Sequence, residues 1–362
     1  MRRARTRRLR KYLATSLVAG IVVVGAGVPI GLLVRSGGDR FGSLPPAVAE
    51  LYVVNTDGSG LTRLTDNEGW DGSPAWSPDG SRIAFVGAEP GQEPDIYVMD
   101  ADGSGPTRLT NNEVLDGSPA WSPDGRHIAF VRHFPNDPQP FENSEIFVMR
   151  ADGSEEVRLT RNDLRDESPL WSPDGSRIAF LRGDGRLRVH VMAADGSDER
   201  PITEHISADP TWSADGTRIA FVSYGAPELY FEEIHVVNAD GTGERALTDY
   251  PGSDYLPAWS PTGSHIAWSR DGDVWLMRPD GSEKTRITSG RQDAPIWSPD
   301  GAWILVVRFV DAQSLNSELF LIRPDGSDEV RLTNHSGPDE SPAWSPDGTR
   351  IVFTRAETSA AR

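Results

Sequence analysis

Acidic side chains recur at one position of a repeated phrase and are the first candidates for chemistry. The phrase is W-S-P-D-G, and in five of its seven copies an aspartate stands five residues before the tryptophan. The other two copies have Ser207 and Gln292 there, with Asp209 and Asp293 close by. Carboxylates gathered in this way attract cations or basic segments. This first acidic series is Asp71, Asp116, Asp166, Asp254 and Asp339.

A second acidic series stands just before the phrase I-Y-V-M-D-A-D-G-S and its variants, with Arg188 as the exception. Such acids can also have a purely structural role, because a carboxylate accepts backbone hydrogen bonds where a loop enters a strand. For any single residue the architectural interpretation is favoured, whereas for the summed charge both interpretations stay open. The second series is Glu50, Asp95, Glu145, Glu233, Asp273 and Glu318.

Other kinds of site have weaker support. His205 and His335 share a register, two residues after a repeated threonine, but a zinc-like site needs three or four ligands. The D-A-D-G-S stretch at 100–104 is too short for a calcium-binding EF-hand loop and favours a hairpin turn. The chain has no cysteine, which excludes disulfides, thiolate metal sites and a cysteine nucleophile. It also has no G-x-S-x-G motif.

Three phrases predict the strands that must position these acids. S-P-D-G and D-G-S predict tight turns, since Pro presets φ, Asp accepts local hydrogen bonds and Gly takes the left-handed position. Between the turns, "SPAW", "RIAFV", "IYVM" and "TRLT" predict four strands per unit. Four-stranded units repeating every 38–50 residues predict an all-β propeller, and seven copies predict seven blades. The repeated tryptophans are expected to fill the space between blades.

The two ends of the repeat region complement each other. Residues 50–65 hold the second half of a unit, and residues 341–355 hold a first half. Paired together they would complete the seventh blade and leave no strand edge open. The propeller is therefore predicted to span residues 50–355, followed by a short tail at 356–362.

Both acidic series are predicted to lie on one side of the propeller. The first strand of each blade lines the central channel, and chain direction alternates from strand to strand. The loops before the first and third strands therefore emerge together, and the S-P-D-G and D-G-S turns emerge opposite. We call these two sides the acidic face and the turn face.

The N-terminus is predicted to be a separate device. Residues 1–12 are strongly basic, and residues 13–34 form 22 uncharged positions, long enough for a transmembrane helix. Basic residues before the span favour a cytoplasmic N-terminus, which places the propeller outside the cytoplasm after a linker at 35–49. A cleaved signal peptide ending at Ala49 is the rival interpretation.

The W-S-P-D-G … I-Y-V-M-D-A-D-G-S … R-L-T pattern resembles the WD40-like PD40 repeats of the TolB-type propeller family over residues 50–355. The resemblance implies a propeller. TolB itself carries an α/β domain before a six-bladed propeller, whereas 49 residues precede the first strand here, so the partners of TolB are not carried over. Similar propellers also precede the hydrolase domain of prolyl oligopeptidase-type enzymes.

The predicted function is binding of a protein or basic peptide in the cell envelope through the acidic face, without a cofactor other than a divalent cation such as calcium. Beyond residue 40 the chain has 27 basic and 53 acidic side chains, and that excess of negative charge argues against nucleic acid. The alternative is a metal-dependent lyase or hydrolase at the channel mouth, because some seven-bladed propellers are lyases with histidine ligands.

Overall fold

The computed structural model describes residues 48–134, 143–224, 232–290, 292–310 and 316–356. Within these ranges the regular secondary structure consists of strands. None of the described segments is a helix of the length and apolar character that a bilayer crossing requires. The predicted basic segment and anchor at 1–34, and all but the end of the linker, lie outside the described residues.

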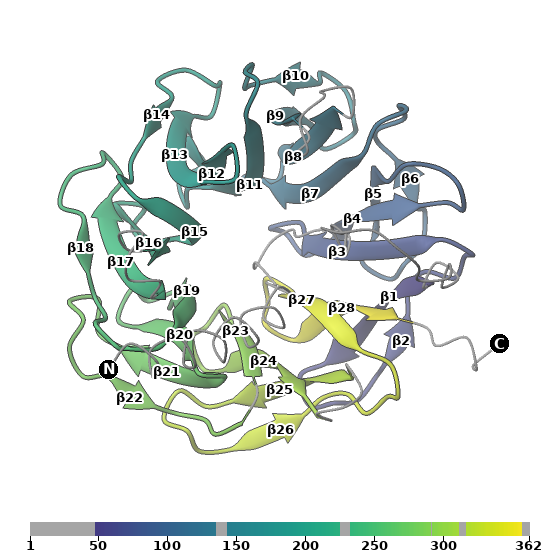
Figure 1. Ribbon diagram of the computed structural model, residues 1–362. Helices are drawn as coiled ribbons and strands as arrows, with labels where there is room; N and C mark the ends of the chain where they lie inside the picture. The colour runs from purple at the N-terminus through teal and green to yellow at the C-terminus, as the bar shows by residue number, and fades with distance from the viewer. Residues whose placement is uncertain (1–47, 135–142, 225–231, 291, 311–315, 357–362) are drawn as a thin grey trace, which may run out of the picture.

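The strands pair in antiparallel groups of four that follow one another around a ring (Figure 1). Single parallel pairings, Ala49 with Trp70 and Ser144 with Arg165, join two pairs of neighbouring groups. In each group the first strand lies nearest the centre and a short fourth strand lies at the rim. This arrangement confirms the prediction of an all-β propeller. Three groups are β3 (Trp70–Trp76), β4 (Arg82–Ala88), β5 (Asp95–Asp100) and β6 (Thr107–Arg108); β7 (Asp116–Trp121), β8 (His127–Phe134), β9 (Asn143–Arg150) and β10 (Val157–Arg158); and β11 (Arg165–Trp171), β12 (Arg177–Gly183), β13 (Arg188–Ala193) and β14 (Arg200–Pro201). Three more are β15 (Ile206–Trp212), β16 (Arg218–Tyr224), β17 (Glu232–Asn238) and β18 (Arg245–Ala246); β19 (Asp254–Trp259), β20 (Ile266–Arg270), β21 (Asp273–Met277) and β22 (Thr285–Arg286); and β23 (Gln292–Trp297), β24 (Ile304–Phe309), β25 (Ser317–Ile322) and β26 (Glu329–Arg331).

A further group joins the two ends of the described chain. It consists of β27 (Asp339–Trp344), β28 (Arg350–Ala356), β1 (Ala49–Asn55) and β2 (Thr62–Arg63). β1 pairs with β28 from Ala49 opposite Ala356 to Asn55 opposite Arg350, and the two lie side by side in Figure 1. Each strand thereby satisfies the backbone groups along the other's edge.

The repeated turns form as their residues predict. In the first S-P-D-G turn, Asp79 accepts hydrogen bonds from the Ser77 hydroxyl at 2.6 Å and the Ser81 backbone N–H at 3.0 Å. Gly80 takes the left-handed conformation with φ +70°. These hydrogen bonds lower the pKa of Asp79 to about 2. The turn aspartates therefore act as local acceptors on the turn face.

Every first strand contains a β-bulge next to the channel that the repeat pattern did not predict. The residue three before the tryptophan has positive φ in all seven copies, although none of the seven is glycine. The pairing between first and second strands shifts at the same place. A bulge inserts one extra residue into a strand and bends it. The bulge residues are Ser73, Ser118, Ser168, Asp209, Leu256, Ala294 and Ser341.

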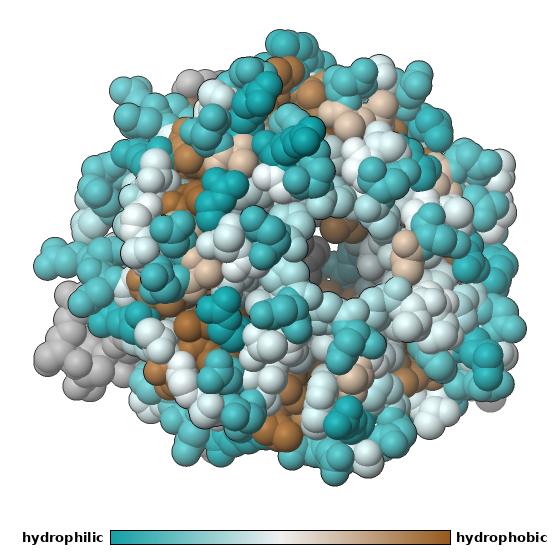
Figure 2. Space-filling view, turned by 180° about the vertical axis from the view of Figure 1, so that it is seen from behind, coloured by the Kyte–Doolittle hydropathy of each residue, from teal (hydrophilic) through white to brown (hydrophobic). Residues whose placement is uncertain are grey.

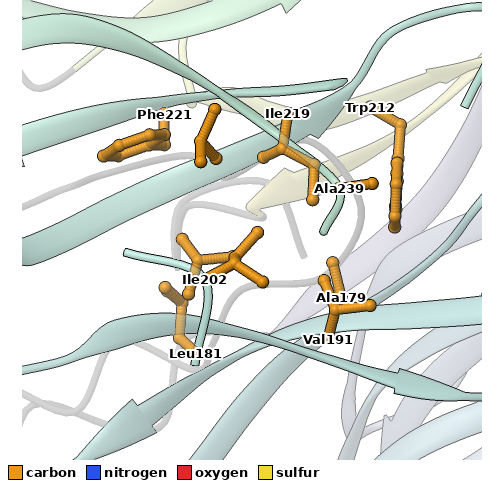
Figure 3. Packing of buried hydrophobic residues seen from close by; sticks show 10 residues of the cluster. Ala179, Leu181, Val191, Ile202, Trp212, Ile219, Phe221 and Ala239 are labelled. Atoms are coloured by element: carbon orange, nitrogen blue, oxygen red, sulfur yellow. The ribbon is translucent and has the colours of Figure 1, made fainter. Parts of the chain in front are cut away.

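The hydrophobic core is divided into layers between neighbouring groups. Figure 3 shows one layer, where Leu181 and Val191 from one group face Trp212, Ile219 and Phe221 from the next. The repeat tryptophan is 7% exposed here, and a buried Trp removes ~150–250 Å² from water. The tryptophans thus lie between blades, as expected.

Candidate functional site

The first acidic series lies at the start of the first strands and is buried. Four of its five carboxylates form bidentate ion pairs with an arginine at the end of the adjacent second strand. In the first of these pairs, Arg132 Nε lies 2.7 Å from Asp116 Oδ1 and Nη2 lies 2.8 Å from Oδ2. The other pairs are Asp166–Arg182, Asp254–Arg270 and Asp339–Arg355.

These arginines also contact other carboxylates or aromatic rings. Arg132 also bonds Glu156 on the outside, and its guanidinium lies 4.6 Å from the centre of the Phe147 ring. Burial by itself would lower the pKa of Arg132. The nearby carboxylates of Asp116 and Glu156 have the larger opposite effect, so the pKa of the arginine is raised. Because planar guanidinium matches carboxylate geometry, such a pair fixes the angle between two strands.

Asp71 departs from this arrangement. Its cross-strand partner is Gly87, where an added Cβ would lie 3.0 Å from Asp71 Oδ1, so no arginine reaches it from that position. Asn67 donates to the carboxylate at 2.6 Å instead. Burial raises the pKa of Asp71 to about 6, against the hydrogen bonds from Thr65 and Asn67. Glu50 nearby adds to the upward shift.

The second acidic series caps the loop that leaves the fourth strand. Glu50 accepts hydrogen bonds from Arg63 Nη2 at 2.8 Å, Thr65 Oγ1 at 2.6 Å and Asn67 N at 2.9 Å. The arginine and threonine belong to the R-L-T phrase, which explains why that phrase repeats. Related bonds join Asp95 to Arg108 and Thr110, Glu145 to Arg158, Glu233 to Thr248, Asp273 to Arg286, and Glu318 to Arg331 and Thr333.

The two series therefore lie together on one face, but mostly as buried acceptors with internal donors. Glu233 and Asp273 are the members that stay partly exposed. A carboxylate that already accepts two or three bonds has little capacity left for an outside ligand. Binding of a partner by these acids stays a prediction. The contacts that they make within the protein fix the ends of strands and the loops beside them.

Other acids give the acidic face its exposed negative charge. They stand in the loops before the first and third strands, where the described arginines with exposed side chains are Arg161 and Arg186, together with Arg188 at the start of β13. Four of these acids, Glu68 and Glu113 among them, stand eight residues before the repeat tryptophan, so the repeat register was a signal for them. For the others, in loops that differ in length and sequence, the charge of each loop was the signal available. The exposed acids are Asp66, Glu68, Glu89, Glu93, Glu113, Asp163, Asp184, Glu204, Asp249 and Asp271.

Exposed hydrophobic side chains accompany these acids. Leu164 is 37% exposed, Tyr250 is 36% exposed and Val310 is 41% exposed, and all three stand in loops of the acidic face. Tyr250 is held by a hydrogen bond to Asp271 Oδ2 at 3.0 Å, with Arg270 against its ring. This face thus combines apolar contact area with negative charge.

The two candidate histidines lie apart. His205 influences the titration of His235 on β17, whereas the His335 backbone N–H donates to Glu318 on β25. His335 Nδ1 also accepts from Gly337 N at 3.0 Å, which leaves only Nε2 for a ligand. Across the described ranges, no three His, Asp or Glu side chains are arranged to hold a metal ion.

Comparison with known proteins identifies the family. The model of the TolB beta propeller domain, PD40, matches residues 43–137, 117–226, 181–307 and 217–360. The chain belongs to this TolB propeller family. In sequence, a segment of 45 residues is 51% identical to dipeptidyl-peptidase 5 of Porphyromonas gingivalis. That segment is 12% of this chain and 7% of the peptidase, so it compares single repeats.

Solved structures share the propeller of this TolB-family chain. An oligogalacturonate lyase in complex with manganese matches with a TM-score of 0.66 and 16% identity, over 87% of this chain and 98% of the lyase. A TolB-like protein from Agrobacterium tumefaciens matches with a TM-score of 0.52 and 19% identity, over 86% and 99%. TolB from Acinetobacter baumannii also has a TM-score of 0.52, and the chain covers 65% of it. At these identities the likeness is one of fold.

Proposed function

We propose that this TolB-family chain is a seven-bladed propeller that binds a protein or a basic peptide segment through its acidic face. The observation that carries the proposal is the joint exposure of Leu164, Tyr250 and Val310 among exposed acids on one face. Protein interfaces combine apolar anchors with a polar rim, and complementary charge steers the partner toward them. A positively charged partner fits this surface best.

Paired substitutions test the face. Leu164→Ser with Val310→Ser removes apolar area from the acidic face, and Leu61→Ser with Val157→Ser is the matched control, since those residues are 47% and 51% exposed elsewhere. Photo-crosslinking in intact membranes should yield a partner with wild type and the control, and lose it with the acidic-face variant. Equal capture by both variants would contradict binding through this face.

We also propose that residues 13–34 anchor the propeller in a membrane of the cell envelope, on the side away from the cytoplasm. The basic residues 1–12 followed by 22 uncharged positions support this orientation. Carbonate extraction should leave the full-length protein in the membrane pellet. Recovery of a soluble protein that begins at Glu50 would instead demonstrate cleavage after Ala49.

A metal-dependent lyase or hydrolase is the second candidate, and the fold likeness to the manganese-bound lyase favours it. In this chain His335 could offer a metal only Nε2, because Nδ1 accepts from Gly337. Titration with manganese, comparing wild type with His335→Ala, distinguishes the two functions. Saturable binding that depends on His335 would favour the lyase.

A further inference from the structure

The indole N–H groups of the repeat tryptophans reveal one irregular junction in the ring. Six of the seven donate to the carbonyl of the residue before the preceding tryptophan; Trp121, for example, donates to the Ala75 carbonyl at 3.1 Å. The seventh, Trp259, is 7% exposed, and its Nε1 has no hydrogen-bond partner. A buried donor without an acceptor is costly to a native structure, so it suggests a missing ligand.

A buried carboxyl lies at the same junction. Asp209 occupies the bulge position of β15, where four other repeats have serine, and it is 8% exposed. Burial raises its pKa to about 7, although the Leu256 backbone N–H donates to it, and Glu232 adds to the rise. Among the described residues no arginine, lysine or histidine forms an ion pair with Asp209. A cation beside it would restore the lost solvation of the carboxylate.

A cavity lies beside these two residues. It has a volume of about 290 Å³, and both Asp209 and Trp259 belong to its wall. The remaining wall is largely apolar, with Pro257, Pro295 and Trp297 among its residues. Figure 2 looks into the central opening of the ring, where hydrophobic atoms are visible inside the rim. This volume is at the small end for ligand pockets, and suits one long side chain or a molecule of that size.

The cavity lies away from the surface proposed for protein binding. Its wall includes Pro261, Ser298 and Pro299, which belong to the S-P-D-G turns and so to the turn face. None of the exposed acids and exposed hydrophobic residues of the acidic face belongs to this wall, although Glu232 at the start of β17 still influences the pKa of Asp209. The two sites can therefore be tested independently.

We propose that this cavity binds a small aliphatic cation of the arginine or lysine side-chain type. Its guanidinium or ammonium group pairs with Asp209, its methylene stem lies along the prolines, and a carbonyl oxygen accepts from Trp259 Nε1. Each part of the ligand matches one feature of the wall. The positive charge forms an ion pair with the buried carboxyl, the stem contacts the apolar surface, and the carbonyl accepts a hydrogen bond from the indole N–H that has no other partner.

L-Argininamide and L-lysinamide are suitable probes, because each combines a cation, an aliphatic stem and a carbonyl. Isothermal titration should give saturable binding to the wild-type protein with a Kd below about 10 mM. L-Citrullinamide is the matched control ligand, since a neutral urea replaces the guanidinium, and it should not bind. A capped Gly-Arg-Gly peptide shows whether the same side chain is accepted from a polypeptide or only as a free cation.

Substitutions locate the site. Asp209→Asn should weaken argininamide binding by about tenfold or more, and Trp259→Phe by about threefold, because the first removes a charged partner and the second a single hydrogen bond. The matched controls are Asp198→Asn, an exposed acid of the turn face, and Trp121→Phe, whose indole already has a partner. Both controls should bind as wild type does.

A readout on the unaltered protein keeps the test decisive if Asp209→Asn folds poorly. The indole ¹H–¹⁵N resonance of Trp259, assigned by its loss in Trp259→Phe, should move on addition of argininamide while the Trp121 resonance stays in place. If neither probe binds saturably, or binding is unchanged in Asp209→Asn, or the Trp259 resonance does not move, the proposal is wrong.

Discussion

Arg132 on the second strand of one blade donates two parallel hydrogen bonds to Asp116 on the first strand. Nε lies 2.7 Å from Oδ1 and Nη2 lies 2.8 Å from Oδ2. The Asp116 side chain is fully buried and the Arg132 side chain is 13% exposed. The same pair recurs in three other blades, each time with the arginine sixteen residues after the aspartate. These acids hold the strand ends together on the face where the exposed loops emerge.

Breaking this pair is expected to be costly. Asp116→Ala leaves Arg132 buried without its main partner, and should lower the free energy of unfolding by about 3–5 kcal/mol. Asp71→Ala is the matched control, since the residue has the same position but no arginine. At pH 5, below the pKa of Asp71, losing its bonds from Asn67 and Thr65 should cost about 1–2 kcal/mol. Urea denaturation measures both. Equal losses would show that the ion pair contributes nothing beyond a strand cap.

Asp71 should make stability depend on pH. Its pKa is about 6 in the native state against an ordinary value of 3.8, so the native state holds this proton more tightly than the unfolded chain does. Stability from this group is therefore fully present below pH 3.8 and is lost as the pH rises through about 6. The total loss should be about 3 kcal/mol.

Asp71→Asn isolates this effect, because the amide does not titrate and the other carboxylates are shared by both proteins. Denaturation of the two proteins between pH 4 and pH 8 should show wild type losing stability relative to the variant as the pH rises. Parallel curves would mean that Asp71 titrates normally in the native state.

Periodic features of the fold could be predicted from the sequence, and features that depend on register could not. The strands, the turns and the Trp layers follow from local patterns. The Asp116–Arg132 pair was missed although its interval of sixteen repeats, because residues on two strands become neighbours only when the pairing register is known. The exposed acids were missed for a different reason. Glu68, Glu113 and Asp163 share a register, eight residues before the repeat tryptophan, but register alone does not show which loop side chains face solvent.

The cavity shows a third limit of sequence reasoning. Asp209 is a local exception within a repeat, and the bulge that places it in the wall of one cavity with Trp259 is a property of the folded strand. Asp209 could be read from the sequence, but its burial and the missing acceptor of Trp259 could not. Those follow from how two neighbouring first strands lie against each other.

Pairing of the chain ends should be essential for cooperative unfolding. Deleting residues 341–362 removes most of β27 and all of β28, and leaves β1 with an open edge beside the buried core residues Leu51 and Val54. The truncated protein should lose its sharp thermal transition. Deleting only residues 357–362, which follow β28, is the control and should leave the transition intact. A full-length melting temperature in the longer deletion would contradict a structural role for this pairing.

The acidic face is expected to bind divalent cations. Carboxylates gathered on one face repel one another. Although no three described side chains form a ready metal site, a cation such as calcium that is drawn to the summed charge would relieve this repulsion. Calcium should raise the melting temperature more than monovalent salt of matched ionic strength, which only screens. The combined substitutions Glu68→Gln, Glu113→Gln and Asp163→Asn, all exposed, should abolish the difference. Equal effects of the two salts on wild type would rule out a specific cation site.

The repeat tryptophans should differ in what their indole N–H contributes. Trp121→Phe removes the partly buried hydrogen bond to the Ala75 carbonyl, which should cost about 1 kcal/mol beyond the smaller ring. Trp259→Phe removes a ring of nearly equal burial, 7% against 8% exposed, whose N–H has no partner to lose. Its cost should be smaller by that amount, as measured by urea denaturation in the absence of any added ligand. Were the two variants equally destabilised, Trp259 would have an acceptor like its counterparts, and the cavity beside Asp209 would lose the donor that the proposed ligand requires.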